Sequence, residues 1–177
     1  MLVNLIIYLS LIYSSPLYTS SQGMVRFESK ATLEKIIGTS NELKGIINPL
    51  NNTFQFSVAM NSFHGFNSQL QKEHYQENYV ESDKYPNAYF KGKIIEDIDY
   101  TSVGTYFVRA KGNFELHGFS FNKIMEAKVI VKDNNALEVQ CDFSLNLREY
   151  SIKVPRLVHK KLAENLKINV TLTMNKQ

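Results

Sequence analysis

Four histidines are the residues of this sequence that could most directly bind a metal or transfer a proton. They are His64, His74, His117 and His159. A zinc site needs ligands at short, regular spacing, and none of the four has a second His, Cys or Asp at such spacing in one predicted element. The sequence also lacks a G-x-S-x-G motif, a glycine-rich phosphate loop and an H-E-x-x-H motif. We therefore predict no catalytic constellation, no metal site and no cofactor.

The single cysteine, Cys141, excludes a disulfide within the chain and a metal site built from several cysteines. Its nearest neighbours at period two are apolar, which predicts that Cys141 points inward and packs as a small apolar side chain. Glu96, Asp97 and Asp99 form an acidic group without the EF-hand pattern, so we interpret it as a solvated loop rather than a calcium site.

The composition is that of one globular domain. The chain has 177 residues, of which 44% are hydrophobic and 21% charged. Lys and Arg number 20 and Asp and Glu 17, so the net charge is 20 − 17 = +3. No run of basic residues reinforces this surplus, and we expect no nucleic-acid partner.

The first 23 residues differ from the rest because they contain no Asp, Glu, Lys, Arg or His. Their apolar part, Leu2 to Tyr13, is shorter than the roughly 20 residues of a spanning helix, and small polar residues follow it. This pattern predicts a signal peptide over residues 1–23, cleaved after Ser21 or Gly23, although no basic residue precedes it. The alternative is that these residues are a frayed apolar tail, or that the start codon is placed too far downstream. The prediction implies a domain over residues 24–177, a periplasmic or secreted protein, and no transmembrane span.

The remaining chain is dominated by the period-two alternation of β-strands. Four long segments alternate apolar and polar side chains, and four shorter runs resemble them; the eight are residues 106–116, 119–131, 137–147, 166–174, 25–31, 43–47, 53–60 and 88–95. Each has one apolar face, and closing the sheet on itself both buries that face and removes the strand edges. We therefore predict an all-β fold, an eight-stranded antiparallel barrel.

Two segments break this alternation and predict short helical inserts. Residues 68–80 begin with Ser68 and Gln71 at the spacing of a capping box and carry a partial apolar stripe. Residues 156–164 follow Pro155, which suits a first helical turn, and pair Val158 with Leu162.

Three motifs resemble a known family. Residues 74–90 (HYQENYVESDKYPNAYF), 114–119 (FELHGF) and 145–152 (LNLREYSI) are similar, in order and spacing, to motifs of the YceI-like family. The last motif departs from the family by placing Ser151 where a glycine is usual. The resemblance covers residues 25–174, and residues 63–66 with the insert that follows resemble the variant found in Bacteroidetes-type bacteria.

The resemblance implies a lipocalin-like barrel that binds an isoprenoid chain in an apolar tunnel and is exported to the periplasm. Family members are not known as enzymes of established reaction, and related barrels often pair, which leaves a homodimer open. The resemblance and the alternation together give these candidate ligand-binding residues: Phe54, Phe56, Val58, Met60, Phe63, Phe66, Leu70, Phe90, Tyr106, Val108, Ala110, Phe114, Met125, Val129, Val139, Phe143, Ile168 and Val170.

Three alternatives stay open at this point. Eight strands can enclose either a ligand or a core filled by side chains, and the bulky inward residues alone favour the filled core. An enzyme could modify a lipid or quinone in the same cavity, using His117 or Tyr106. A barrel without a ligand could serve as an interaction module at the cell envelope.

Overall fold

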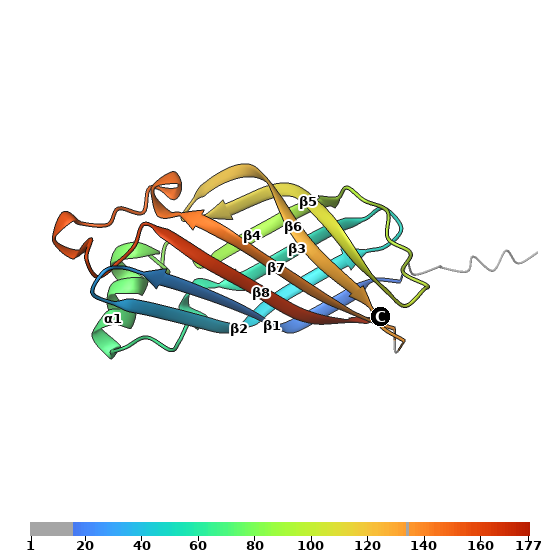
Figure 1. The fold of residues 1–177 in the computed structure, drawn as a ribbon, viewed down its shortest axis with the longest axis horizontal. Coiled ribbons are helices and arrows are strands. Elements are labelled where there is room, and N and C mark those ends of the chain that lie inside the picture. Colours follow the sequence, from blue (N-terminus) through green and yellow to red (C-terminus); the bar gives the residue numbers. More distant parts are fainter. Residues whose placement is uncertain (1–15, 134) are drawn as a thin grey trace, which may run out of the picture.

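The computed structural model describes residues 16–133 and 135–177, and within them eight antiparallel strands close into a barrel in sequence order (Figure 1). The strands are β1 (Tyr18–Lys30), β2 (Lys35–Asn48), β3 (Thr53–Ala59), β4 (Asn87–Ile94), β5 (Gly104–Leu116), β6 (Phe119–Val131), β7 (Ala136–Asn146) and β8 (Asn165–Lys176). The helical elements are η1 (Met60–Ser62), α1 (Gln69–His74), η2 (Tyr75–Tyr79), η3 (Leu147–Tyr150) and η4 (Arg156–Val158). The predicted fold class is confirmed.

Two strands are longer than the alternation predicts. β1 begins at Tyr18 rather than residue 25, and β2 begins at Lys35 rather than residue 43. In β1 a bulge between Ser20 and Val25 shifts the register and interrupts the period. In β2 the buried positions Gly38 and Ser40 are not large apolar residues, so no apolar face is visible in the sequence.

The early start of β1 bears on the expected signal peptide. Residues 1–15 lie outside the described residues, so most of the expected segment 1–23 does too. The predicted cleavage positions, after Ser21 or Gly23, fall inside β1. Tyr18 at the start of this strand is 2% exposed and is paired with Ile47 and Lys176. Cleavage at either position would remove part of this strand.

The turns follow the local sequence. His117 and Gly118 join β5 to β6 with φ angles of 52° and 76°, and Asn52 and Asn135 adopt 57° and 56° in two further connections. Glycine and asparagine tolerate this left-handed conformation, which suits them to these turns. Within the barrel wall Gly92 faces Gly112, where a Cβ atom on Gly92 would lie 2.1 Å from the backbone of β5.

The helical inserts are only partly as predicted. Residues 68–80 form α1 and the π-helical turn η2, and the Ser68 hydroxyl caps the helix by accepting a hydrogen bond from the Gln71 amide at 3.1 Å. The helix predicted over residues 156–164 is instead one short turn, η4. The Val158 carbonyl then accepts hydrogen bonds from the Lys161 amide at 2.8 Å and the Leu162 amide at 2.9 Å.

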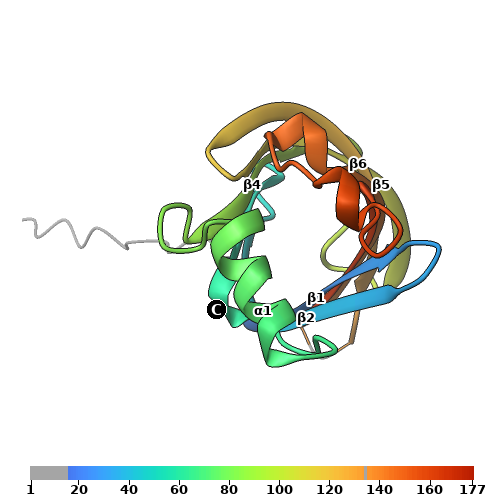
Figure 2. The same cartoon turned by 90° about the vertical axis from the view of Figure 1, so that its left-hand side faces the viewer.

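The two ends of the barrel differ. One end carries the β1–β2 turn, the insert with α1 and the long β7–β8 connection (Figure 1, left; Figure 2 looks onto it). We call it the mouth end. At the opposite end Tyr18, Leu137 and Met174 are almost fully buried, and Tyr100 stacks on Tyr18 with ring centroids 5.8 Å apart. Side chains therefore fill the barrel at that end.

Candidate ligand cavity

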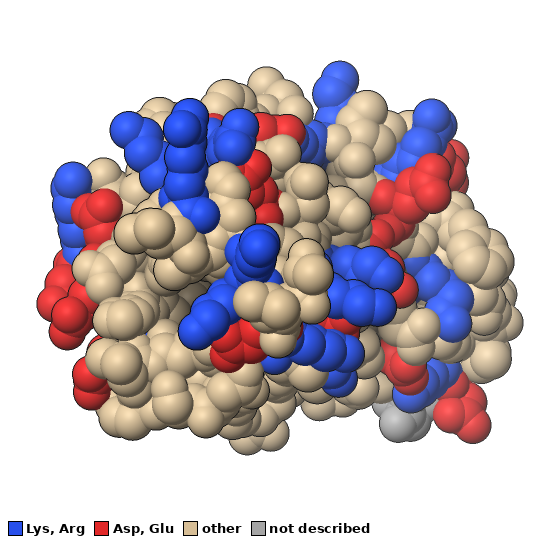
Figure 3. All heavy atoms as spheres, turned by 60° about the vertical axis from the view of Figure 1, so that its left-hand side comes forward, with Lys and Arg blue, Asp and Glu red and all other residues tan. Residues whose placement is uncertain are grey.

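The barrel encloses a cavity of about 500 Å³ that is lined by residues from all eight strands. The inward faces that alternation brings to this interior are aliphatic or aromatic. Lining residues such as Ile47, Phe54, Val129 and Leu172 are 5% exposed or less, so the walls are densely packed around the empty space. In Figure 3 the mouth end comes forward, and a hollow opens among uncharged residues with Lys and Arg close by.

All but one of the residues that the sequence singles out for ligand binding line this cavity. They are Phe54, Phe56, Val58, Met60, Phe63, Phe66, Leu70, Phe90, Val108, Ala110, Phe114, Met125, Val129, Val139, Phe143, Ile168 and Val170. Leu70 lies at the rim, where its side chain is 59% exposed. The interior is therefore not the core filled by side chains that the bulky residue types favour.

Tyr106 is the exception, because it does not line the cavity. It lies near the start of β5, at the filled end of the barrel, and its hydroxyl donates a hydrogen bond to the Asp99 carbonyl at 3.2 Å. Alternation assigns a residue to the inner face of a strand but says nothing about its depth along the barrel axis. This position removes Tyr106 as a catalytic group for the cavity.

An aromatic cluster surrounds the cavity near the mouth end. The Tyr75 ring of η2 lies 5.6 Å from Phe27 of β1, 5.8 Å from Phe63 and 5.0 Å from Phe66. Tyr75 is 9% exposed, and its burial raises the pKa of its hydroxyl well above the usual value. The insert is thus fixed to the barrel by stacked and tilted rings, each pair of which is favourable by about 1 kcal/mol.

Several lining residues are absent from the sequence-based set. Phe27 and Ile36 come from the mouth ends of β1 and β2, Tyr75 comes from the insert, and Val158 and Leu162 come from the β7–β8 connection. The sequence contains a signal for the last two, because residues four apart share one helix face. The signal does not reveal that this face closes over a cavity.

The polar groups of the lining are few and gather at the mouth. Gln71 of α1 donates from its amide to the Glu34 carboxylate at 3.0 Å, and Asn67 donates to the same oxygen at 3.0 Å. These bonds tie the insert to the β1–β2 turn. Ser57, Ser68, His74 and Lys161 contribute further polar groups to the lining.

Cys141 lines the cavity, as its alternation predicts. Its Sγ donates a hydrogen bond to the Glu126 carbonyl at 3.2 Å. Burial, followed by the neighbouring Asp142 charge, raises the pKa of the thiol to about 11. At neutral pH the side chain is thus a thiol and not a nucleophilic thiolate.

His117 is buried but faces away from the cavity. Its Nδ1 lies 2.9 Å from the Tyr150 carbonyl oxygen and its Nε2 lies 3.2 Å from Glu81 Oε1. The Tyr85 ring packs against the imidazole edge, with centroids 4.6 Å apart. His117 therefore joins the β5–β6 turn to the end of the insert and to η3, a structural role.

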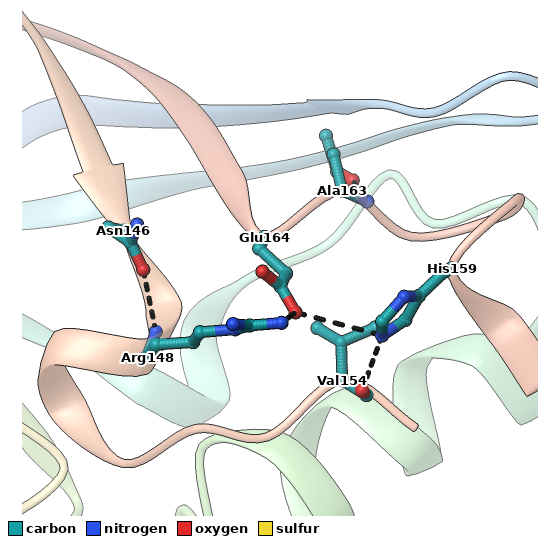
Figure 4. A network of polar contacts seen from close by, with 7 residues as sticks. Asn146, Arg148, Val154, His159, Ala163 and Glu164 are labelled. Carbon is teal, nitrogen blue, oxygen red and sulfur yellow. Dashed lines mark hydrogen bonds and ion pairs between the residues drawn. The ribbon is translucent and has the colours of Figure 1, made fainter. Parts of the chain in front are cut away.

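The β7–β8 connection is held over the barrel by a polar network (Figure 4). Asn146 Oδ1 accepts a hydrogen bond from the Arg148 amide, and Arg148 Nη2 lies 2.6 Å from Glu164 Oε1. His159 Nε2 lies 2.8 Å from the Val154 carbonyl and 3.6 Å from the same Glu164 oxygen.

Ser151 follows η3 with φ of 56° and ψ of 18°, a left-handed conformation. This explains why a glycine is usual at that position of the motif, since glycine adopts such angles without steric cost. The turn nevertheless forms with serine.

The cavity contains no catalytic pair within the part of the chain that the structure describes. None of its titratable lining residues is hydrogen-bonded to another one, and no group of three or more His, Cys, Asp or Glu side chains could hold a metal ion. In the same residues, no helix has both the length and the apolar character to span a membrane.

Comparison with solved structures shows the same fold at low sequence identity. A polyisoprenoid binding domain from Saccharophagus degradans matches with a TM-score of 0.76 and 15% identity, over 91% of this chain and 98% of that one. Burkholderia cenocepacia BcnA matches with a TM-score of 0.69 and 12% identity, over 85% and 95%. The Campylobacter jejuni YceI protein matches with a TM-score of 0.60 and 14% identity, over 79% and 84%.

A search of curated proteins finds no match to this chain. The family model of the YceI-like domain, in contrast, matches residues 18–174. The matched segment begins with the first residue of β1 and ends within β8. The chain belongs to the YceI-like domain family.

Proposed function

We propose that this barrel binds one apolar chain, an isoprenoid or a similar lipid, and shelters it from water. The observation that carries the proposal is the cavity of about 500 Å³ with an almost wholly apolar lining. The likeness to a polyisoprenoid binding domain supports the choice of an isoprenoid. No catalytic group is required for such binding.

The cavity volume limits the length of the chain. An engineered cavity of roughly 150 Å³ accepts benzene, which has six carbon atoms. By the same ratio, a cavity of about 500 Å³ accommodates on the order of 20 carbon atoms, or about four isoprene units. The side chains at the filled end, including Leu137 and Met174, prevent a longer chain from passing through the barrel.

Water exclusion supplies the driving force. Each buried methylene contributes about 0.8 kcal/mol, so one five-carbon unit contributes roughly 3–4 kcal/mol before ordering costs. A few units are sufficient for micromolar binding after the costs of ordering and association. The few polar groups at the mouth, such as Gln71 and Lys161, would face the polar end of the ligand.

Native mass spectrometry of protein purified without added lipid, followed by organic extraction, tests the proposal. We expect an apolar chain of about 20 carbons to leave with the protein and to be identified in the extract. Protein that stays ligand-free, and that also fails to take up an added prenyl alcohol, would contradict the proposal.

We further propose that the protein is exported, to the periplasm or the cell exterior. Its signal would have to end before Tyr18 to leave β1 intact, since Tyr18 is buried and paired with two strands. N-terminal sequencing of exported protein tests this, and an intact Met1 would contradict it. The homodimer stays a prediction, which light scattering at known concentration would test.

A further inference from the structure

The β7–β8 connection carries a concentration of positive charge at the mouth end. Residues 151–163 contain four basic residues, Lys153, Arg156, Lys160 and Lys161, and no Asp or Glu. We call this segment the basic loop. Its charge of +4 exceeds that of the whole chain, since 3 − 4 leaves −1 for all other residues.

These four side chains are available to a partner. Each of the four residues is exposed. Among the described residues, the nearby Glu164 is instead engaged by Arg148 and His159. None of the ion pairs between residues that the structure describes involves a Lys or Arg of the basic loop.

Large apolar side chains are exposed beside these charges. Leu157, in η4 at the centre of the basic loop, is 97% exposed. Leu33, in the β1–β2 turn, is 67% exposed, and its amide donates a hydrogen bond of 2.7 Å to the Lys160 carbonyl. This bond joins the two loops into one surface, although they are far apart in sequence. Exposed apolar side chains next to basic ones form the combination by which peripheral segments bind membrane surfaces.

We propose that this surface, formed by the basic loop and Leu33, docks the mouth end on an anionic lipid membrane. The basic side chains would lie against the lipid phosphates, and Leu157 and Leu33 would enter the boundary between headgroups and acyl chains. The rim residues Lys161 and Val158 belong to the same loop, so docking would turn the cavity opening toward the bilayer.

An acidic protein is the other partner that positive charge could suit. The two exposed leucines favour the membrane, because a bilayer accepts isolated apolar side chains without a shaped pocket. The position of the surface beside an apolar cavity supports the same choice, since a hydrophobic ligand would pass between bilayer and barrel without crossing water.

Co-sedimentation with vesicles tests this proposal. The wild-type chain should bind phosphatidylcholine vesicles containing phosphatidylglycerol and bind pure phosphatidylcholine vesicles much more weakly. Each basic residue near an anionic surface strengthens binding about fivefold. Arg156→Gln/Lys160→Gln should therefore weaken binding to the anionic vesicles about 25-fold, and Leu157→Ser should weaken binding at high salt as well.

A matched control is Lys93→Gln/Lys111→Gln, which removes two charges that face each other on β4 and β5, away from the mouth end. It should bind the anionic vesicles as the wild type does, and circular dichroism would confirm that each variant is folded. Wild-type binding that does not depend on anionic lipid would overturn the proposal, as would an equal loss in the control. An absence of vesicle binding would also overturn it and direct the search to an acidic protein.

The test is independent of the proposed cavity function. Lipid extracted from Arg156→Gln/Lys160→Gln, whose changed side chains lie outside the cavity lining, reports on the cavity alone. A variant that still carries its lipid but does not bind vesicles separates the two functions. If the wild type carries lipid but does not bind vesicles, only the proposed docking surface is contradicted.

Discussion

Replacing Ala110 with phenylalanine should shorten the chain that the barrel can hold. Ala110 lies on the inner face of β5 and lines the cavity. A phenyl ring needs a space of roughly 150 Å³, judged from the engineered cavity that accepts benzene. This is about a third of the 500 Å³ available, or one isoprene unit of the ligand.

The loss of one unit fixes the expected magnitude. Burial of five carbons contributes roughly 3–4 kcal/mol, so a chain that fills the wild-type cavity should bind Ala110→Phe about 100-fold more weakly or worse. A chain one or two units long should be almost unaffected, because the remaining space accommodates it. The ring enters an existing cavity, so the variant should remain folded.

Titration of prenyl alcohols, monitored by calorimetry, measures the effect. Lys111→Phe is the matched control, because Lys111 is the next residue of β5 and is exposed on the outer face. It adds the same ring outside the barrel and should leave the affinity unchanged. If folded Ala110→Phe binds a long chain with wild-type affinity, the ligand does not occupy this cavity.

Three further predictions concern stability and reactivity. Ser151→Gly should raise the free energy of unfolding by about 1 kcal/mol, because Ser151 is held at φ of 56°; a loss of stability in urea titration would refute this explanation. The His117→Asn variant should keep the turn, because asparagine tolerates the same backbone conformation, but it loses the contact with the Tyr150 carbonyl. We therefore expect its free energy of unfolding to fall by about 2 kcal/mol and amide exchange near Glu81 to become faster. Wild-type exchange rates there would contradict this role of His117. Cys141 should react with iodoacetamide slowly at neutral pH and faster as the pH approaches the thiol pKa of about 11; rapid neutral labelling would show that it is not buried.

The strand pattern was predictable wherever the inward residues are apolar. β5 is the clearest case, since Val108 and Ala110 are buried while Arg109 and Lys111 are exposed. The same rule missed the first half of β2, because the ring of Phe27 occupies the space where a side chain on Gly38 would lie. A small residue that makes room for a neighbour looks in sequence like a residue of a turn.

The cavity lining was predictable to the same degree, but the cavity itself was not. Alternation identifies inward residues, yet depth along the barrel decides that Ala110 faces empty space and Tyr106 does not. Whether a barrel is filled depends on how side chains from distant strands meet, as Tyr18 and Tyr100 do at the filled end. Composition and periodicity carry no information about these contacts.

The dependence of affinity on chain length tests the central claim most directly. For prenyl alcohols of increasing length, binding to the wild-type protein should strengthen with each unit up to about four units and then level off, because the filled end stops the chain. An affinity that is the same for short and long chains would show that the apolar interior does not hold the ligand.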